Sequence, residues 1–351
     1  MPKVLLIQEN TATGGVSRIS EHLTQGLRTH GWVTHSISLR QGSLALRLIQ
    51  AWTQAKQHDV LLATHNFLPA YAAWVLSALT GKPWLMWVHG PIIPVLAFAQ
   101  ASTSKQRFLR WFYRRVPHVV FASHAARHSF EAFAQPLPPS QHRHVIHNAS
   151  NIQQPSCLAQ PSTAHPIRIG FVGRLSEEKQ ALQLLALLDH LPAHYQLHVI
   201  GDGPLMTDMQ RQGQPHMASG RLHLHGAQAV TASTYMAWQA TVLCSAYEGY
   251  PMTALESLAC GVPCVSTPIP AMQEMLHAQA PYMLAARDTP DALAQALLDT
   301  LQTPAAQRQQ NMAAITQAHT PEKFAASWSQ LLHLAIQTQA HPGANATGPQ
   351  A

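Results

Sequence analysis

The segment Ser245–Pro263 decides the fold, and it reads Ser-Ala-Tyr-Glu-Gly-Tyr-Pro-Met-Thr-Ala-Leu-Glu-Ser-Leu-Ala-Cys-Gly-Val-Pro. The apolar run before it, 241–244, predicts the end of a buried strand, and a turn follows. Residues 252–260 predict a short helix, because Pro251 stands near its first position and Gly261 just past its end. The last proline of the segment prevents the helix from resuming.

Two glutamates of this segment lie where a ligand would bind. Glu248 follows the strand beside the helix N-terminus, and Glu256 lies within the helix. In open α/β sheets ligands bind outside the carboxyl ends of the strands, and a helix N-terminus favours an anion. Two carboxylates beside an anion site suit a nucleotide sugar, which has phosphates in the middle and hydroxyls at both ends. The alternative is an ordinary loop glutamate and an ordinary helical one.

The spacing of Glu248 and Glu256, with Tyr250 between them, resembles the signature of retaining glycosyltransferases of family 4. Other motifs of that family occur in the same order, each at the end of an expected strand. The resemblance runs from residue 14 to about residue 330. The motifs are Gly14-Gly15-Val16, His89, Gly173-Arg174 with Lys179, and Gly201-Asp202-Gly203-Pro204.

The resemblance implies an α/β protein with the GT-B fold, in which two Rossmann-like, doubly wound parallel-sheet domains face a cleft. The expected acceptor-side domain covers residues 1–160, and the nucleotide-sugar domain covers 161–320. A terminal helix over 321–338 is expected to pack back on the first domain, and 340–351 is expected to be disordered. The beginning of the first domain supports this fold without the resemblance. Its residues predict a strand, a glycine turn and a helix in that order, which is how a doubly wound sheet begins.

Residue roles follow from the resemblance. Arg174 and Lys179 are expected to clasp the donor diphosphate, Glu248 to hold hydroxyls of the transferred sugar, and Glu256 to hold the ribose. His89 is expected near the transferred sugar; the alternative is a structural histidine, since the chain contains 23. The expected catalytic residues are His89, Arg174, Lys179 and Glu248. The expected donor-binding residues are Gly14, Gly15, Gly173, Gly201, Tyr250, Pro251, Met252, Thr253 and Glu256.

No metal or cofactor is expected besides the nucleotide-diphosphate sugar, with a UDP-sugar favoured. The sequence contains no Asp-x-Asp with which to clamp a metal. Two fixed cations and a helix dipole can neutralise a leaving diphosphate instead.

Composition limits the class of protein. Hydrophobic residues make up 46% of the 351 residues, and charged residues 11%. The first residues lack a signal peptide's basic region, and the apolar stretch 67–80 is too short to span a bilayer. The four cysteines follow no disulfide or metal framework, so we expect reduced thiols in a cytoplasmic protein.

Charge is distributed unevenly along the chain. Residues 1–160 carry about +10 and residues 161–351 about −4. Within the basic half, Lys105–Arg115 mixes cations with aromatic residues, which suits a membrane interface. A solvated basic helix is the alternative. No nucleic-acid fold is recognised, so no nucleic-acid partner is expected.

The resemblance therefore implies a retaining, metal-independent hexosyltransferase. It would move sugar from a UDP-sugar to a lipid-linked or envelope-polysaccharide acceptor, as in lipopolysaccharide synthesis. The enzyme would be cytoplasmic and peripheral on the inner face of the plasma membrane, bound to anionic lipid through Lys105–Arg115. Two alternatives remain, namely a GT-B nucleotide-sugar epimerase and a catalytically inactive GT-B partner subunit.

Overall fold

The computed structural model describes residues 1–9, 15–150, 152 and 166–340. Contacts divide the chain into two compact units, one of Met1–Asn148 with Pro321–Ala351 and the other of Ala149–Thr320. Residues 151–166 are rich in Gln, Pro, Ser and Thr, which predicts an interdomain linker, and they lie almost wholly outside the described residues, as do Gly14 and residues 341–351. Within the described chain, no helix is both long and apolar enough to cross a bilayer.

The first unit is built on a six-stranded parallel sheet of order β2-β1-β3-β4-β5-β6. Its central strands are apolar on both faces because helices cover both, as parallel sheets require. The strands are β1 (Lys3–Gln8), β2 (Val33–Ser38), β3 (Val60–Ala63), β4 (Trp84–Val88), β5 (His118–Phe121) and β6 (His142–Val145). The helices are α1 (Gly15–Thr29), α2 (Leu44–Ala55), α3 (Leu68–Thr80), α4 (Ile92–Phe98), α5 (Thr103–Tyr113), α6 (His124–Ala134) and α15 (Pro321–Ala340).

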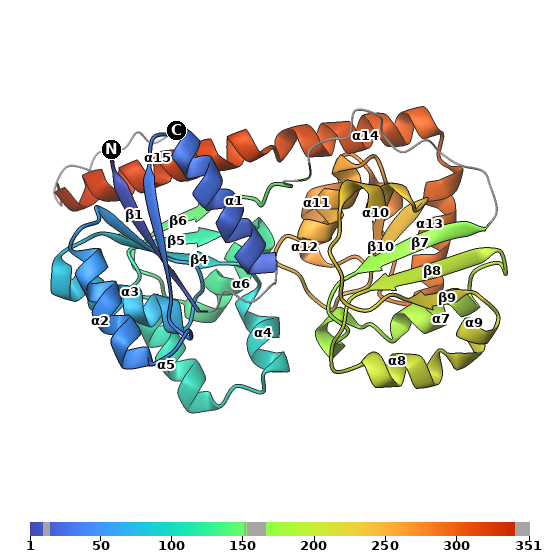
Figure 1. Cartoon of the computed structure of the whole chain (residues 1–351), viewed down its shortest axis with the longest axis horizontal. Helices are drawn as coiled ribbons and strands as arrows, with labels where there is room; N and C mark the ends of the chain where they lie inside the picture. The colour runs from blue at the N-terminus through green and yellow to red at the C-terminus, as the bar shows by residue number, and fades with distance from the viewer. Residues whose placement is uncertain (10–14, 151, 153–165, 341–351) are drawn as a thin grey trace. The chain divides into compact units, whose positions relative to one another are not determined.

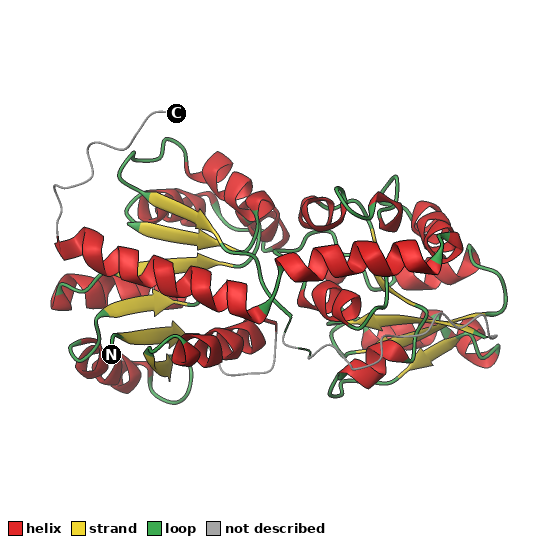
Figure 2. Ribbon diagram, turned by 90° about the horizontal axis from the view of Figure 1, so that it is seen from above, coloured by secondary structure: helices red, strands yellow, loops and turns green. Residues whose placement is uncertain are grey.

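Helices α2 to α6 lie on one face of this sheet, and α1 and α15 lie on the other (Figure 1). Viewed from above, α15 lies over the sheet (Figure 2). Helices α1 and α15 approach closely, because a Cβ added at Gly26 would lie 2.6 Å from the Cβ of Ala325. Trp328 is fully buried against Trp87, and the indole of Trp32 donates a hydrogen bond to Ser329. Helix α15 is therefore part of the first unit, although residues 149–320 separate it in sequence from the rest of that unit.

The second unit contains a five-stranded parallel sheet of order β11-β10-β7-β8-β9. Helices α7 and α13 pack on one face, while α10 and α11 pack on the other, with α14 against α11. The strands are β7 (Ile167–Val172), β8 (Tyr195–Ile200), β9 (Leu222–Leu224), β10 (Ala240–Leu243) and β11 (Cys264–Ser266). The helices are η1 (Glu177–Lys179), α7 (Gln183–Asp189), α8 (Met206–Gln212), α9 (Gln214–Ala218), α10 (Ala232–Met236), α11 (Met252–Ala259), α12 (Pro270–Leu276), η2 (Pro281–Met283), α13 (Pro290–Gln302) and α14 (Ala305–Ala318).

The strand–turn–helix expected around Ser245–Pro263 is present as β10, a loop and α11. The sequence also predicts a short helix over 234–240. This prediction is wrong at its end, because α10 stops at Met236 and Ala240 already pairs with Ile169 in the sheet. The three described cysteines are free and buried.

Candidate active site

The order of the strands places the ligand-binding edge of the second sheet. From β7 the chain proceeds outward to β8 and β9, then returns to build β10 and β11 on the other side. The direction therefore reverses between β7 and β10, and in such sheets ligands bind outside the carboxyl ends of the strands that flank the reversal. Gly173 and Arg174 follow β7, and the loop with Glu248 follows β10. The topology thus brings these two motifs to one edge.

An ion pair joins the two loops at this edge. The Lys179 ammonium lies 2.5 Å from Oε1 of Glu248, and the Ser245 hydroxyl donates to the same oxygen at 2.6 Å. The Lys179 and Glu248 side chains are 28% and 13% exposed, so each retains contact with solvent. Such a partly exposed pair orients both groups more than it stabilises the fold.

Backbone contacts hold the same two loops in register. The amide of Ala246 donates to the carbonyl of Glu178 at 2.9 Å, and the Cys244 thiol approaches the carbonyl of Lys179 at 3.3 Å. Burial raises the pKa of Cys244 to about 12, so this residue remains a neutral thiol. The 3-10 turn that carries Lys179 is therefore tied to the end of β10.

Arg174 is exposed, and the turn that carries it is packed against the Gly201–Pro204 turn. A Cβ at Gly201 would lie 1.8 Å from the carbonyl oxygen of Gly173, and one at Gly203 would lie 2.3 Å from that of Leu175. The amide of Leu175 also donates to the carbonyl of Asp202 at 3.0 Å. The glycines of this motif are therefore required where two backbone turns touch. In this structure Gly201 packs against the turn that carries Arg174 and helps to fix its conformation.

Glu256 is 3% exposed on α11 and accepts a hydrogen bond from the Tyr235 hydroxyl at 2.6 Å. Tyr235, on α10, is fully buried. The hydrogen bond fixes one carboxylate oxygen from a neighbouring helix, which stabilises a buried carboxylate. Sequence reasoning did not identify Tyr235, since no local pattern relates it to a residue 21 positions later.

The start of α11 is close-packed. Tyr250 is 3% exposed, and its hydroxyl lies 2.5 Å from Nε2 of His319 just after α14. Burial raises the pKa of Tyr250 well above its ordinary value. Pro251 caps the helix, Met252 is buried and Thr253 is half-buried. The Tyr250 hydroxyl is thus engaged by the protein, and Thr253 is the more accessible of these residues.

His89 belongs to the first unit and follows β4. Its Nε2 lies 2.7 Å from the carbonyl oxygen of Thr64, which can only accept, so Nε2 carries the proton. Burial, reinforced by His65, lowers the pKa of His89 to about 3. The imidazole is therefore neutral near pH 7, and its Nδ1 is the acceptor nitrogen. Gly15 begins α1, and the space around it is open.

Potential metal ligands do not gather at the edge of the second sheet. Within either unit taken by itself, the described residues bring no three His, Cys, Asp or Glu side chains together in a way that could hold an ion. Charged groups that a ligand at this edge could reach include Arg174, Lys179 and Glu248.

Comparison with known sequences identifies relatives of part of the chain. Residues 166–303 match the family model described as glycosyl transferases group 1. The lipopolysaccharide 1,6-galactosyltransferase of Escherichia coli (strain K12) is 31% identical over 117 residues, 32% of this chain and 33% of that protein. The chain spans between 26% and 36% of the length of the curated relatives it matches.

Solved structures resemble nearly the whole chain. Anabaena Alr3699/HepE, solved with UDP and glucose, has a TM-score of 0.78 at 16% identity, covering 95% of this chain and all of that one. The sucrose-phosphate synthase of Thermosynechococcus elongatus has a TM-score of 0.80 at 17% identity, covering 96% of this chain and all of that one. At such identities the likeness concerns the fold.

Proposed function

Because this chain has the GT-B fold and belongs, through residues 166–303, to the glycosyl transferases group 1 family, we propose that it is a retaining glycosyltransferase. It would transfer a hexose-type sugar from a UDP-sugar to a lipid-linked or envelope-polysaccharide acceptor at the inner membrane face. The observation that carries this proposal is the grouping of Arg174, Lys179 and Glu248 where the second sheet reverses direction.

The names of relatives support the donor and acceptor classes. The E. coli relative is a lipopolysaccharide 1,6-galactosyltransferase, and Alr3699/HepE has been solved with UDP, with UDP and glucose, and with UDP-glucose. A UDP-hexose is accordingly the first donor to test, and a glycan of the bacterial envelope the first acceptor.

In the proposed mechanism the protein positions the donor and stabilises charge. Arg174 and Lys179 would neutralise the leaving diphosphate, together with the N-terminus of α11 near Thr253. Glu248, oriented by Lys179 and Ser245, would accept hydrogen bonds from sugar hydroxyls, and Glu256 from the ribose. Neutral His89, with Nε2–H held by Thr64, would accept from a sugar hydroxyl at Nδ1. The acceptor would attack on the face from which the phosphate departs, so that the leaving phosphate takes its proton.

Donor recognition can be tested without knowing the acceptor. We expect a UDP-sugar to raise the melting temperature, because ligand at one hundred times its Kd adds about 2.7 kcal/mol of stability. GDP- and ADP-sugars serve as matched controls. The Lys179→Ala variant should lose most of the shift. If every nucleotide sugar leaves the wild-type melting temperature unchanged, the proposed donor site is wrong.

Retention and metal independence need a turnover assay. Once an acceptor is found, the product's anomeric configuration, read by NMR, should match that of the donor. EDTA should leave turnover unchanged, since two cations and a helix N-terminus are proposed to neutralise the leaving diphosphate in place of a metal ion. Loss of turnover in EDTA that Mg²⁺ or Mn²⁺ restores would contradict this mechanism.

A further inference from the structure

Large apolar side chains are exposed in one part of the molecule. Apart from Met1, every such side chain among the described residues lies between positions 44 and 111, and the second unit presents none. Large apolar surface left in water commonly marks an interaction site. These side chains are Leu44, Leu46, Ile49 and Trp52 on α2, Val75 and Leu79 on α3, Ile93 and Phe98 on α4, and Phe108 and Trp111 on α5.

Helices α2, α3 and α5 lie in one layer over the first sheet (Figure 1). Helix α3 packs against α5 through aromatic rings, with Tyr71 and Phe108 centred 5.6 Å apart and Trp74 and Trp111 5.7 Å apart. Helix α2 packs against the other side of α3. We call the outer surface of these three helices the α2–α3–α5 face.

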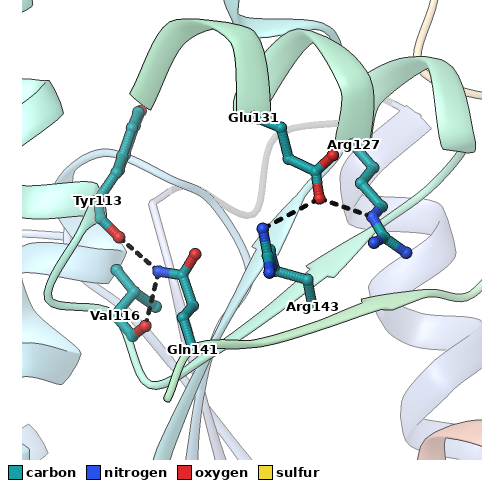
Figure 3. A network of polar contacts seen from close by, with 6 residues as sticks. All are labelled: Tyr113, Val116, Arg127, Glu131, Gln141 and Arg143. Carbon is teal, nitrogen blue, oxygen red and sulfur yellow. Dashed lines mark hydrogen bonds and ion pairs between the residues drawn. The ribbon is translucent and has the colours of Figure 1, made fainter. Parts of the chain in front are cut away.

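This face is cationic and contains no acidic residue. Between Asp59 and Glu131 the sequence has no Asp or Glu, and α2 has none either. Glu131, on α6, is itself paired, because one of its oxygens accepts from Arg127 at 2.9 Å and from Arg143 at 3.3 Å (Figure 3). Exposed cations remain on or beside α2 and α5, namely Lys56, Lys105, Arg107, Arg110 and Arg115.

Two of these cations stand directly beside exposed aromatic rings. The ammonium of Lys56 lies 3.5 Å from the ring centre of Trp52, and the guanidinium of Arg115 lies 4.0 Å from that of Trp111. Tryptophan and a cation side by side suit the headgroup level of a bilayer, where an apolar body meets lipid phosphates.

The structure also separates the two functions of α5. Arg110 donates to the carbonyl of Phe133, and Arg114 donates to the carbonyls of Ala134 and Gln135, so both secure the end of α6. Gln141 donates to the carbonyls of Tyr113 and Val116 (Figure 3). These contacts fix α5 as a rigid support, while Lys105, Arg107, Phe108 and Trp111 lie on its exposed side.

We propose that the α2–α3–α5 face docks the protein on an anionic lipid bilayer. This inference deepens the proposed function, on which it rests, by naming the surface that would reach a membrane-borne acceptor. A second copy of the chain fits less well, because a two-fold interface would place this cationic face against itself. An anionic bilayer can bury the exposed apolar side chains of this face, and its negative charge attracts the cations, which no acidic residue of the face opposes.

Vesicle co-sedimentation tests the proposal. We expect at least tenfold more wild-type protein to pellet with phosphatidylcholine vesicles containing phosphatidylglycerol than with phosphatidylcholine alone, and salt to weaken the binding. Two variants should each reduce binding at least tenfold: Lys105→Glu with Arg107→Glu, and Leu46→Ser with Ile49→Ser. All four side chains are exposed, and glutamate at position 105 is favourable in the first turn of α5, so the fold should persist.

The matched control makes the same charge change on the second unit, by Arg211→Glu with Arg287→Glu, and should bind as wild type does. Loss of binding in this control would mean that only net charge matters, and wild type remaining in the supernatant at low salt would overturn the proposal. Dimers that Leu46→Ser with Ile49→Ser dissociates would assign the face to a second copy. The UDP-sugar thermal shift, measured on the same proteins, reports separately on the donor site.

Discussion

Lys179 and Glu248 form a mutually oriented pair of opposite charge, with Ser245 as a third partner. The pair spans two loops, so neither side chain is fixed by its own loop alone. Because Arg174 adds a second cation nearby in sequence and at the same strand end, the group keeps a net positive charge that a diphosphate can neutralise. Loss of one member should therefore disturb the others.

We expect Lys179→Ala and Arg174→Ala each to reduce turnover by about 100–1,000-fold, the usual effect of removing one group that stabilises a developing charge. Lys179→Ala with Glu248→Ala should cost less than the two single changes combined, because the side chains are in direct contact. Steady-state kinetics measure both effects. Arg211→Ala, which removes an exposed cation on α8, is the control. Near-normal turnover in both single variants would place the diphosphate elsewhere.

Gly201 offers a test of the packed turns. Gly201→Ala should destabilise the protein by more than the about 1–2 kcal/mol that a positive φ alone costs, because its Cβ would overlap the Gly173 carbonyl. Gly220→Ala is the matched control, since its φ is also positive and the space around it is open. Denaturant unfolding measures both. Equal losses in the two variants would show that the close approach to Gly173 contributes nothing.

The sequence placed Arg174 and Glu248 after strands and Glu256 within a helix, because glycine and proline mark the ends of strands and helices locally. It did not reveal Tyr235 or His319, which reach their partners across the fold. Local patterns report which element a residue occupies, whereas a hydrogen bond between distant elements depends on how those elements pack. The role of Gly201 required coordinates for the same reason.

At the scale of helices and strands, two histidine groups share one design. A histidine on an inner strand pairs in register with the first residue of a His-x-His on the edge strand, as His118 does with His142 and His198 with His223. The rings stack, with centres 4.8 Å and 4.6 Å apart respectively. Burial, followed by the neighbouring histidines, lowers the pKa of His118 and of His198 to about 4.

Folding stability should consequently fall as the solution is acidified. A histidine with a folded pKa near 4 and an unfolded pKa near 6.5 takes up protons preferentially when unfolded, so its contribution is present above about pH 6.5 and is lost toward pH 4. For buried His118, the free energy of unfolding lost on acidification is about 1–3 kcal/mol. Urea unfolding at several pH values should show a flatter profile in His118→Asn, while His190→Asn, at an exposed position, should retain the wild-type slope. An unchanged slope in His118→Asn would contradict the assignment.

Two helices show where patterns mislead. Helix α14 was not anticipated, because it is rich in Ala and Gln and buries few large side chains, chiefly Met312 and Ile315. Helix α5 was anticipated, but periodicity could not distinguish cations that face solvent from Arg114, which serves α6. An amphipathic pattern predicts which side of a helix is buried. Which residues contact its polar side depends on the tertiary structure, which the pattern does not contain.

At the scale of the whole chain, the first unit is discontinuous. Its sheet comes from the first 148 residues, and the helix that covers one face, α15, comes after the second unit. Trp328 lies at the centre of the contact between α15 and the sheet, where it is fully buried against Trp87 and Phe324.

We expect Trp328→Ala to destabilise the first unit by about 3–5 kcal/mol, the usual cost of deleting a buried tryptophan. The second unit should keep its UDP-sugar thermal shift, so calorimetry should show one transition lowered and the ligand-sensitive transition retained. Gln330→Ala, which alters an exposed position on the same helix, is the control. A uniform loss in both transitions would indicate that the units do not unfold separately.

The late position of α15 has a consequence for biosynthesis. A nascent chain leaves the ribosome from its N-terminus, so the sheet and α1 emerge long before the helix that covers them. Residues 149–320 must be translated in between, which takes on the order of 10–30 s at about 5–20 residues per second. During that interval the buried surface around Trp87 and Gly26 is uncovered, and a chaperone has its best opportunity to bind. The second unit, continuous in sequence, can fold as soon as it is free of the exit tunnel.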